Sequence, residues 1–243
     1  MKEKKYEFVL YFLCISLVLF SCVIGNSYRL IADIDINRPA SSLNRLEDIE
    51  IPVVILDAGH GGEDPGAIGV DGTFEKDLNL IMVNKISEYL KLAGVDTVLT
   101  RQDDKLLYKP EENIKGQKKM YDLKNRYLIA CEYERSVFVS IHMNKYSDGK
   151  YKGLQVYYSK NNKRGEDMAL DVQKAVCEYL QKGNERQIKE GRNIYLLERL
   201  MCPAVLIECG FLSNEEDCRN LCDNEYTDKM AFLISYAILE NIC

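Results

Sequence analysis

The chain has 243 residues and a formal net charge of −6, with 47% hydrophobic and 29% charged residues. These proportions are ordinary for a globular protein, and the length allows one α/β domain plus an N-terminal extension. The acidic balance argues against a general nucleic-acid binder, because such a protein needs a basic face. We therefore expect no nucleic-acid partner.

The N-terminus has the pattern of an export segment. Three lysines within the first five residues precede an uncharged run from Phe8 to Gly25. A run of that length can just cross a bilayer, and the lysines predict a cytoplasmic N-terminus. We predict a membrane anchor or signal segment at 1–25, a polar tether at 26–50 and a folded domain at 51–243. A cleaved signal, a lipid anchor on Cys22 and an uncleaved anchor all place that domain outside the cytoplasmic membrane.

Two patterns of apolar residues alternate along the predicted domain, one typical of strands and the other of helices. Short apolar runs predict buried strands, and spacings of three and four residues predict amphipathic helices. The alternation indicates an α/β fold: a single domain with a largely parallel, twisted sheet flanked by helices on both faces. We expect strands at 53–57, 95–101, 137–142, 154–158 and 203–211, helices at 74–93, 120–133, 166–180, 214–222 and 226–242, and a charged surface excursion at 102–119.

Both histidines of the chain lie at the ends of predicted strands. His60 follows the run Val53–Leu56 within a glycine-rich turn, and His142 ends the run that starts at Val137. Because open α/β sheets bind ligands outside the carboxyl ends of their strands, both imidazoles are candidates for one site. Glu208 lies near the end of another predicted strand.

Glu75 falls in the first turn of a predicted helix, where a glutamate also interacts favourably with the helix dipole. Two imidazoles and a carboxylate form a familiar catalytic zinc set, and a second carboxylate can act as general acid and base. Spacing alone does not say whether Glu75 or Glu208 would bind the metal. The pattern predicts a zinc hydrolase. Two competing classes are disfavoured, because the sequence has neither the GxSxG elbow of a serine hydrolase nor a complete Walker motif.

Nine cysteines are present, none of them in a CxxC motif. Cys218 and Cys222 are one helical turn apart and could share a face. We interpret the cysteines as free thiols that serve as small apolar residues. Strand alternation places Cys209 on the face opposite Glu208, which predicts a core position for Cys209 rather than a role as nucleophile.

Four ordered motifs resemble those of the zinc-dependent N-acetylmuramoyl-L-alanine amidases of the cell-wall-lytic type. They are Leu56-Asp57-Ala58-Gly59-His60-Gly61-Gly62, Glu75 with Leu78-Asn79, Ser140-Ile141-His142-Met143-Asn144, and the run from Pro203 to Asn214. The match extends from about residue 52 to the C-terminus. The resemblance implies that 51–243 is a zinc amidase catalytic domain. It also implies that His60, Glu75 and His142 bind Zn²⁺ and that Glu208 is the catalytic acid and base.

Within that family, the stretches Asn184–Lys189 and Tyr195–Leu197 resemble the germination-specific amidases of spore formers. This implies spore-cortex peptidoglycan, with its glycan strands and stem peptides, as substrate, and a role in muramic-δ-lactam formation. It also implies a location between the forespore membranes, with the membrane reached through the N-terminal segment. Because three protein ligands could hold zinc loosely, an activating protein partner is a further hypothesis.

Two alternatives stay open at this stage. One is another zinc peptidase of the cell wall, acting within the stem peptide. The other is a catalytically silent peptidoglycan-binding module.

Overall fold

The structure is a computed structural model in which residues 51–242 are described. The predicted anchor or signal segment at 1–25 and the tether at 26–50 lie outside the described residues, so both remain predictions. None of the helices within 51–242 combines the length and the apolarity that crossing a bilayer requires.

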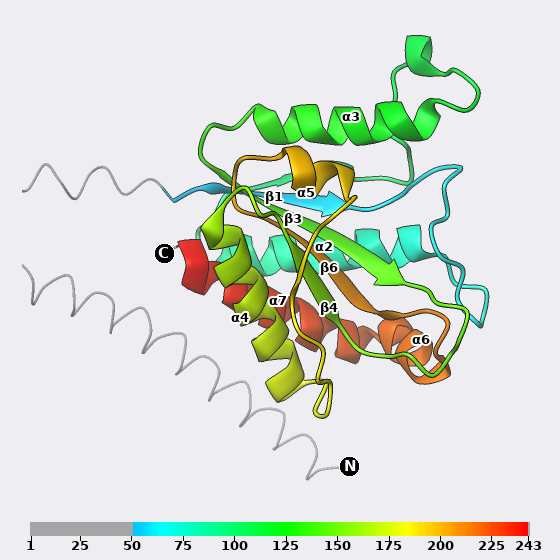
Figure 1. The fold of residues 1–243 in the computed structure, drawn as a ribbon, viewed down its shortest axis with the longest axis vertical. Helices are drawn as coiled ribbons and strands as arrows, with labels where there is room; N and C mark the ends of the chain where they lie inside the picture. The colour runs from blue at the N-terminus through cyan, green and yellow to red at the C-terminus, as the bar shows by residue number, and fades with distance from the viewer. Residues whose placement is uncertain (1–50, 243) are drawn as a thin grey trace, which may run out of the picture. The chain divides into compact units, whose positions relative to one another are not determined.

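One six-stranded sheet forms the centre of the described domain, in the order β2-β1-β3-β6-β4-β5 (Figure 1). Strands β1 (Val53–Ala58), β2 (Thr97–Leu99), β3 (Ser136–Asn144) and β6 (Ala204–Phe211) are parallel to one another. Strand β4 (Gln155–Tyr158) is antiparallel to β6, and β5 (Lys189–Glu190) pairs in parallel with β4. The prediction of a largely parallel sheet is confirmed, with β4 and β5 as its exceptions.

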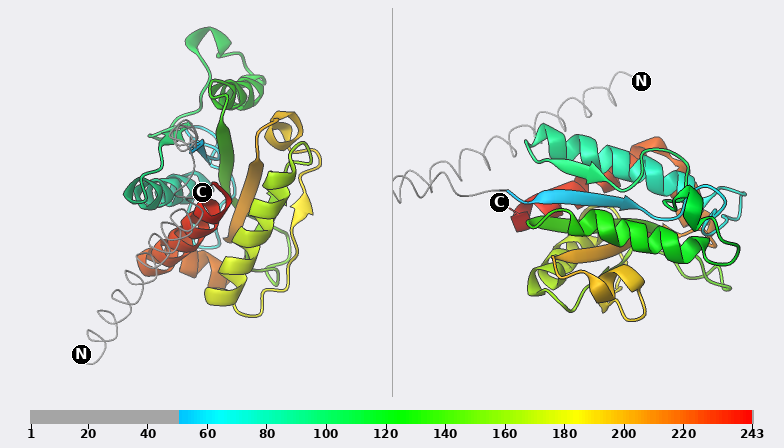
Figure 2. Two further views of the ribbon diagram at one scale, coloured as in Figure 1. Left: turned by 90° about the vertical axis from the view of Figure 1, so that its left-hand side faces the viewer. Right: turned by 90° about the horizontal axis from the view of Figure 1, so that it is seen from above.

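Helices cover both faces of the sheet, as predicted (Figure 2). Along β3, Val139 and Ile141 enter the larger apolar core, while Phe138 enters a smaller one on the opposite face, as strand alternation requires. The larger core is covered by α2 (Glu75–Leu92), α4 (Lys163–Tyr179) and α7 (Asn224–Ile242). The smaller core is covered by α3 (Lys118–Cys131) and α5 (Tyr195–Arg199), and α6 (Glu215–Cys222) packs against β6 and α7.

Most predicted elements are present, with shifted ends. Strand β2 is shorter than the predicted 95–101, and the excursion 102–119 contains one 3₁₀ turn at Pro110–Glu112 before α3 begins. The stretch 184–198, to which the sequence pattern assigned no element, contains β5 and α5.

The register of the parallel strands brings their polar ends together. Asp57 on β1 pairs with Ser140 on β3, and His142 on β3 pairs with Glu208 on β6. A bulge follows His142 before Asn144 pairs with Phe211. Bulges bend a strand locally and often lie beside active sites, because they redirect side chains. The carboxyl edge of the sheet therefore collects the polar side chains.

Candidate active site

The turn after β1 holds His60 in an unusual backbone conformation. Its φ is 60°, in the left-handed region that costs a non-glycine residue roughly 1–2 kcal/mol. Two buried arginines hold this turn by its carbonyl groups. Arg126 of α3 donates to the carbonyl oxygens of Ala58 and His60, each at 2.7 Å. Arg101 donates to the carbonyl oxygens of Ala58 at 2.9 Å and Gly59 at 3.1 Å.

A buried ion pair anchors Arg126 beneath the turn. Its Nη1 lies 2.6 Å from Oδ1 of Asp57, at the end of β1, and both side chains are almost fully buried. Thr100 and Ser140 donate hydroxyl hydrogen bonds to the same carboxylate at 2.7 and 2.6 Å. Burial alone would raise the pKa of Asp57, but Arg126 and the two hydroxyl groups hold it below its usual value. Asp57 is therefore ionised and fully partnered.

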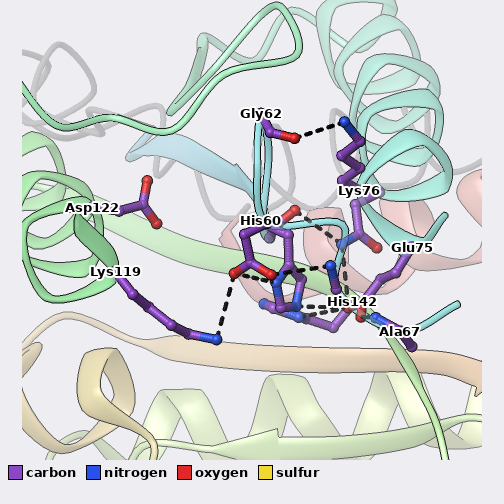
Figure 3. Close-up of polar contacts among 12 residues, drawn as sticks. His60, Gly62, Ala67, Glu75, Lys76, Lys119, Asp122 and His142 are labelled. Carbon is purple, nitrogen blue, oxygen red and sulfur yellow. Dashed lines mark hydrogen bonds and ion pairs between the residues drawn. The ribbon is translucent and has the colours of Figure 1, made fainter. Parts of the chain in front are cut away.

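Three side chains point toward one another at the carboxyl edge of the sheet: His60, Glu75 and His142 (Figure 3). Oε1 of Glu75 lies 3.2 Å from Nε2 of His60 and 2.9 Å from Nδ1 of His142. One candidate ligand atom from each residue lies within 4.8 Å of the other two. The turn after β1, the start of α2 and the end of β3 thus contribute one side chain each to a single cluster.

Hydrogen bonds from outside the cluster fix its orientation. Asp64 lies 2.9 Å from Nδ1 of His60, which leaves Nε2 facing Glu75. The backbone amides of Ala67 and Met143 donate to the two oxygens of Glu75 at 2.7 and 3.0 Å. Metal-binding histidines and carboxylates are commonly held by such outer partners.

The charges of the cluster stabilise one another. Burial lowers the pKa of His60, but the hydrogen bonds with Asp64 and Glu75 outweigh this and raise it to about 9. Burial would raise the pKa of Glu75, yet the hydrogen bonds with His142 and His60 hold it well below its usual value. An anionic carboxylate between two imidazoles is a place that favours positive charge, whether protons or a cation supply it.

Two glycines leave the space that the cluster occupies. A Cβ at Gly59 would collide with the imidazole ring of His142, and a Cβ at Gly66 would meet Glu75 and His60. Gly66 also has a φ of +67°, which disfavours any side chain there. The glycines around His60 therefore serve the close approach of three side chains as well as the turn.

Glu208 lies beside this cluster, on the neighbouring strand. Its Oε2 is buried and has no hydrogen-bond partner among the residues that the structure describes. Burial raises the pKa of Glu208 to about 7, although His142 lowers it in part. A carboxyl group with a pKa near neutrality can both accept and return a proton. Cys209 faces the larger core, on the side away from Glu208, as strand alternation predicts.

The four residues singled out by the sequence thus lie at one edge of the sheet. His60, Glu75 and His142 form the cluster, and Glu208 is paired in register with His142. The supporting groups Asp64, Arg101 and Arg126 were given no role by the sequence. Fold and site together define a class: an α/β domain whose sheet edge carries a possible metal cluster beside a buried carboxyl group.

The family within this class follows from comparison with known proteins. The family model described as N-acetylmuramoyl-L-alanine amidase matches residues 54–240. The chain belongs to the N-acetylmuramoyl-L-alanine amidase family, which confirms the resemblance seen in the motifs. It is 33% identical over 189 residues to the germination-specific N-acetylmuramoyl-L-alanine amidase of Bacillus subtilis, covering 77% of this chain and 78% of that protein.

Solved structures of amidases have the same fold. The CwlD amidase from Clostridioides difficile, solved in complex with the GerS lipoprotein, is 42% identical with a TM-score of 0.75, covering 78% of this chain and 98% of that one. The catalytic domain of the amidase CwlV from Bacillus (Paenibacillus) polymyxa is 31% identical with a TM-score of 0.67, covering 78% of this chain and 97% of that one. The chain is accordingly a peptidoglycan hydrolase that cleaves the amide bond between N-acetylmuramic acid and L-alanine.

Proposed function

We propose that this amidase depends on zinc, with His60, Glu75 and His142 as protein ligands and Glu208 as catalytic acid and base. The convergence of three ligand atoms within 4.8 Å of one another carries the proposal. Two imidazoles and one carboxylate are a catalytic zinc set, which leaves a position for water or substrate. Two further features support metal binding. Asp64 holds Nδ1 of His60, and the absence of side chains at Gly59 and Gly66 leaves room for the three ligands to approach one another.

When bound, zinc would act as a Lewis acid, lowering the pKa of water and stabilising the negative charge that develops on the attacked carbonyl oxygen. Glu208 supplies the proton transfers. As a carboxylate it takes a proton from the attacking water while the new C–O bond forms at the lactyl carbonyl carbon. As a carboxylic acid it then gives that proton to the alanine nitrogen while the C–N bond breaks. A pKa near 7 suits both roles, because neither protonation state is then costly.

The role of Glu208 is tested by Glu208→Gln, which keeps the size of the side chain and removes its basicity. We expect zinc content to be unchanged and amide hydrolysis to fall by about 10²–10⁴-fold, the range that general acid–base catalysis contributes. Glu178→Gln, on the exposed side of α4, is the matched control and should keep full activity. Hydrolysis by Glu208→Gln at the wild-type rate would remove the assignment.

We infer that the substrate is spore-cortex peptidoglycan and that its cleavage prepares muramic acid for δ-lactam formation before germination. The support is the likeness to the germination-specific amidase of B. subtilis. Deleting the gene in a spore-forming host should yield spores whose cortex lacks muramic-δ-lactam, as muropeptide analysis would measure. Spores with normal lactam content would contradict the inference.

We further propose that residues 1–25 direct export and that the catalytic domain lies between the forespore membranes.

We also propose a protein partner that orders the zinc site. The C. difficile amidase forms a complex with a lipoprotein, which supports a partner of that kind. Zinc affinity of the full chain should rise when the partner is added. Tight zinc binding and full activity without any partner would make it unnecessary.

A further inference from the structure

A second set of possible metal ligands lies outside the cluster that contains the histidines. It consists of Asp71, in the loop between β1 and α2, and of Cys218 and Cys222 on α6. One ligand atom from each residue lies within 4.8 Å of the other two. Nothing in the amidase mechanism uses these three side chains.

The two thiols face one carboxylate across two distant parts of the chain. Sγ of Cys218 lies 3.2 Å from Oδ1 of Asp71, and Sγ of Cys222 lies 3.7 Å from Oδ2. The cysteines are four residues apart on α6, so their side chains emerge from the same helix face. In Figure 1 the loop that precedes α2 descends at the same edge of the sheet as α6. The arrangement therefore joins a loop to a helix about 150 positions later in the chain.

The loop is shaped to present Asp71. The backbone amide of Thr73 donates to Oδ1 of Asp71 at 2.9 Å, and the amide of Val70 donates to the carbonyl oxygen of Leu212 at 3.0 Å. A Cβ at Gly69 would lie 2.9 Å from both Asp71 Oδ1 and Cys218 Sγ. A glycine is thus required for the thiol and the carboxylate to approach the same point.

Two thiolates and a carboxylate select a thiophilic divalent cation, for which zinc is the usual biological choice. Around tetrahedral zinc, with Zn–S near 2.3 Å, neighbouring ligand atoms are separated by roughly 3.5–3.8 Å. The two thiol sulfurs lie 3.2 Å (Cys218) and 3.7 Å (Cys222) from the oxygens Oδ1 and Oδ2 of Asp71, close to these values. A water molecule would fill the fourth position of a tetrahedral ion. Asp71 and Cys222 are exposed, so an ion can reach them from solvent.

We propose that Asp71, Cys218 and Cys222 form a structural binding site for a thiophilic divalent cation such as zinc. The ion cross-links the loop at 61–74 to α6. Because that loop continues directly into Glu75 at the start of α2, the cross-link restrains the segment that delivers this residue.

The test uses Cd²⁺ as the probe on the reduced full-length chain, because Cd²⁺ bound to thiolates absorbs in the ultraviolet through charge transfer and Cd²⁺ on imidazole does not. Wild type should show the thiolate band. Cys222→Ala, at an exposed position, should lower Cd²⁺ affinity by more than the roughly 10–100-fold that loss of an outer-shell partner costs. Asp71→Asn should weaken the same band.

Two controls separate this site from other ligands. Cys131→Ala removes an exposed thiol on α3 and should leave the band unchanged. His142→Ala alters the histidine cluster and should also leave it unchanged, so the outcome does not depend on the proposed catalytic zinc. A reduced wild type with no band would overturn the proposal. So would a band that is equally strong in Cys222→Ala, or one that disappears in His142→Ala.

Discussion

His60 occupies a left-handed conformation and yet directs its Nε2 toward Glu75. Side chains that the sequence did not single out make this possible. Asp64 holds the other ring nitrogen, and Arg126 holds the carbonyl group of His60 itself. Strain of this kind persists where the surroundings over-determine it. At the scale of single residues, the site is therefore built from its supports as much as from its ligands.

Gly66 offers a test of that packing. A methyl group there would meet Glu75 and His60, at a backbone φ of +67°. We expect Gly66→Ala to keep the fold and to weaken zinc binding by at least 10-fold, because the two ligands must move apart. Isothermal titration of the metal-free protein with zinc measures the change.

The matched control is Gly116→Ala. Gly116 has a φ of +82°, so an alanine there suffers a similar backbone strain, but nothing lies within 4 Å of the added Cβ. Zinc affinity should be unchanged in this variant. If both variants lost zinc equally, backbone strain rather than contact with the ligands would be the cause.

Residues at the ends of strands could be predicted, and their supports could not. His60, His142 and Glu208 follow apolar runs, and parallel strands end at one edge, so their convergence follows from the pattern. Asp64 is one of several acidic residues in a loop that has no regular apolar spacing, so nothing in the sequence distinguishes it from the others. The contact of Arg126 with Asp57 spans 69 positions and depends on how α3 crosses the sheet, which no local spacing encodes.

At the scale of elements, the Asp57 carboxylate joins the ends of β1 and β3 to α3. Its partners Ser140 and Arg126 come from β3 and α3, and Asp57 itself is the last residue but one of β1. Removing one member of a buried ion pair leaves the other charge unpaired, which costs about 3–5 kcal/mol. We expect Asp57→Asn to lower the free energy of unfolding by that amount at pH 7.

The loss should depend on pH in a defined direction. The pKa of Asp57 in the folded state lies below its value of about 3.9 in the unfolded state. The stability that its charge contributes is then fully present above about pH 4 and is lost as the pH falls through the lower folded-state value. The difference in free energy of unfolding between wild type and Asp57→Asn should therefore become smaller in acid. Denaturant titrations at several pH values measure it. Asp103→Asn, at an exposed surface pair, should show no such difference.

Long elements with a clear period were predictable, whereas short ones were not. The α2 helix and strands β1, β3 and β6 have enough apolar residues in period to be recognised. Strand β5 has two residues and α5 has five, so neither is long enough for its apolar period to repeat. The direction of β4 depends on the loop 145–154. That loop leaves β3 at the carboxyl edge of the sheet and enters β4 at the same edge, so β4 is antiparallel to β6.

At the scale of the whole molecule, zinc binding should couple to the stability of the fold. A ligand held by the folded state alone stabilises it by about 4 kcal/mol at a thousand times its Kd. For a domain of this size each kcal/mol shifts Tm by roughly 2–4 °C. We expect wild type to melt above His142→Ala in zinc, and the difference to shrink when a chelator is added.

The comparison between these two proteins removes the contribution of any ion held elsewhere, since both would carry it. Thermal unfolding followed by circular dichroism measures the two melting temperatures. A difference that persists unchanged in chelator would mean that His142 stabilises the fold without a metal.

The most direct test of the account is mass spectrometry of the products released from purified peptidoglycan by the full-length chain with zinc. The site at the sheet edge predicts free stem peptides that begin with an unblocked L-alanine amine, together with glycan strands stripped of peptide. The same products should be absent with Glu208→Gln. Peptides cut internally while L-alanine stays bound to muramic acid would contradict the account and indicate a peptidase instead.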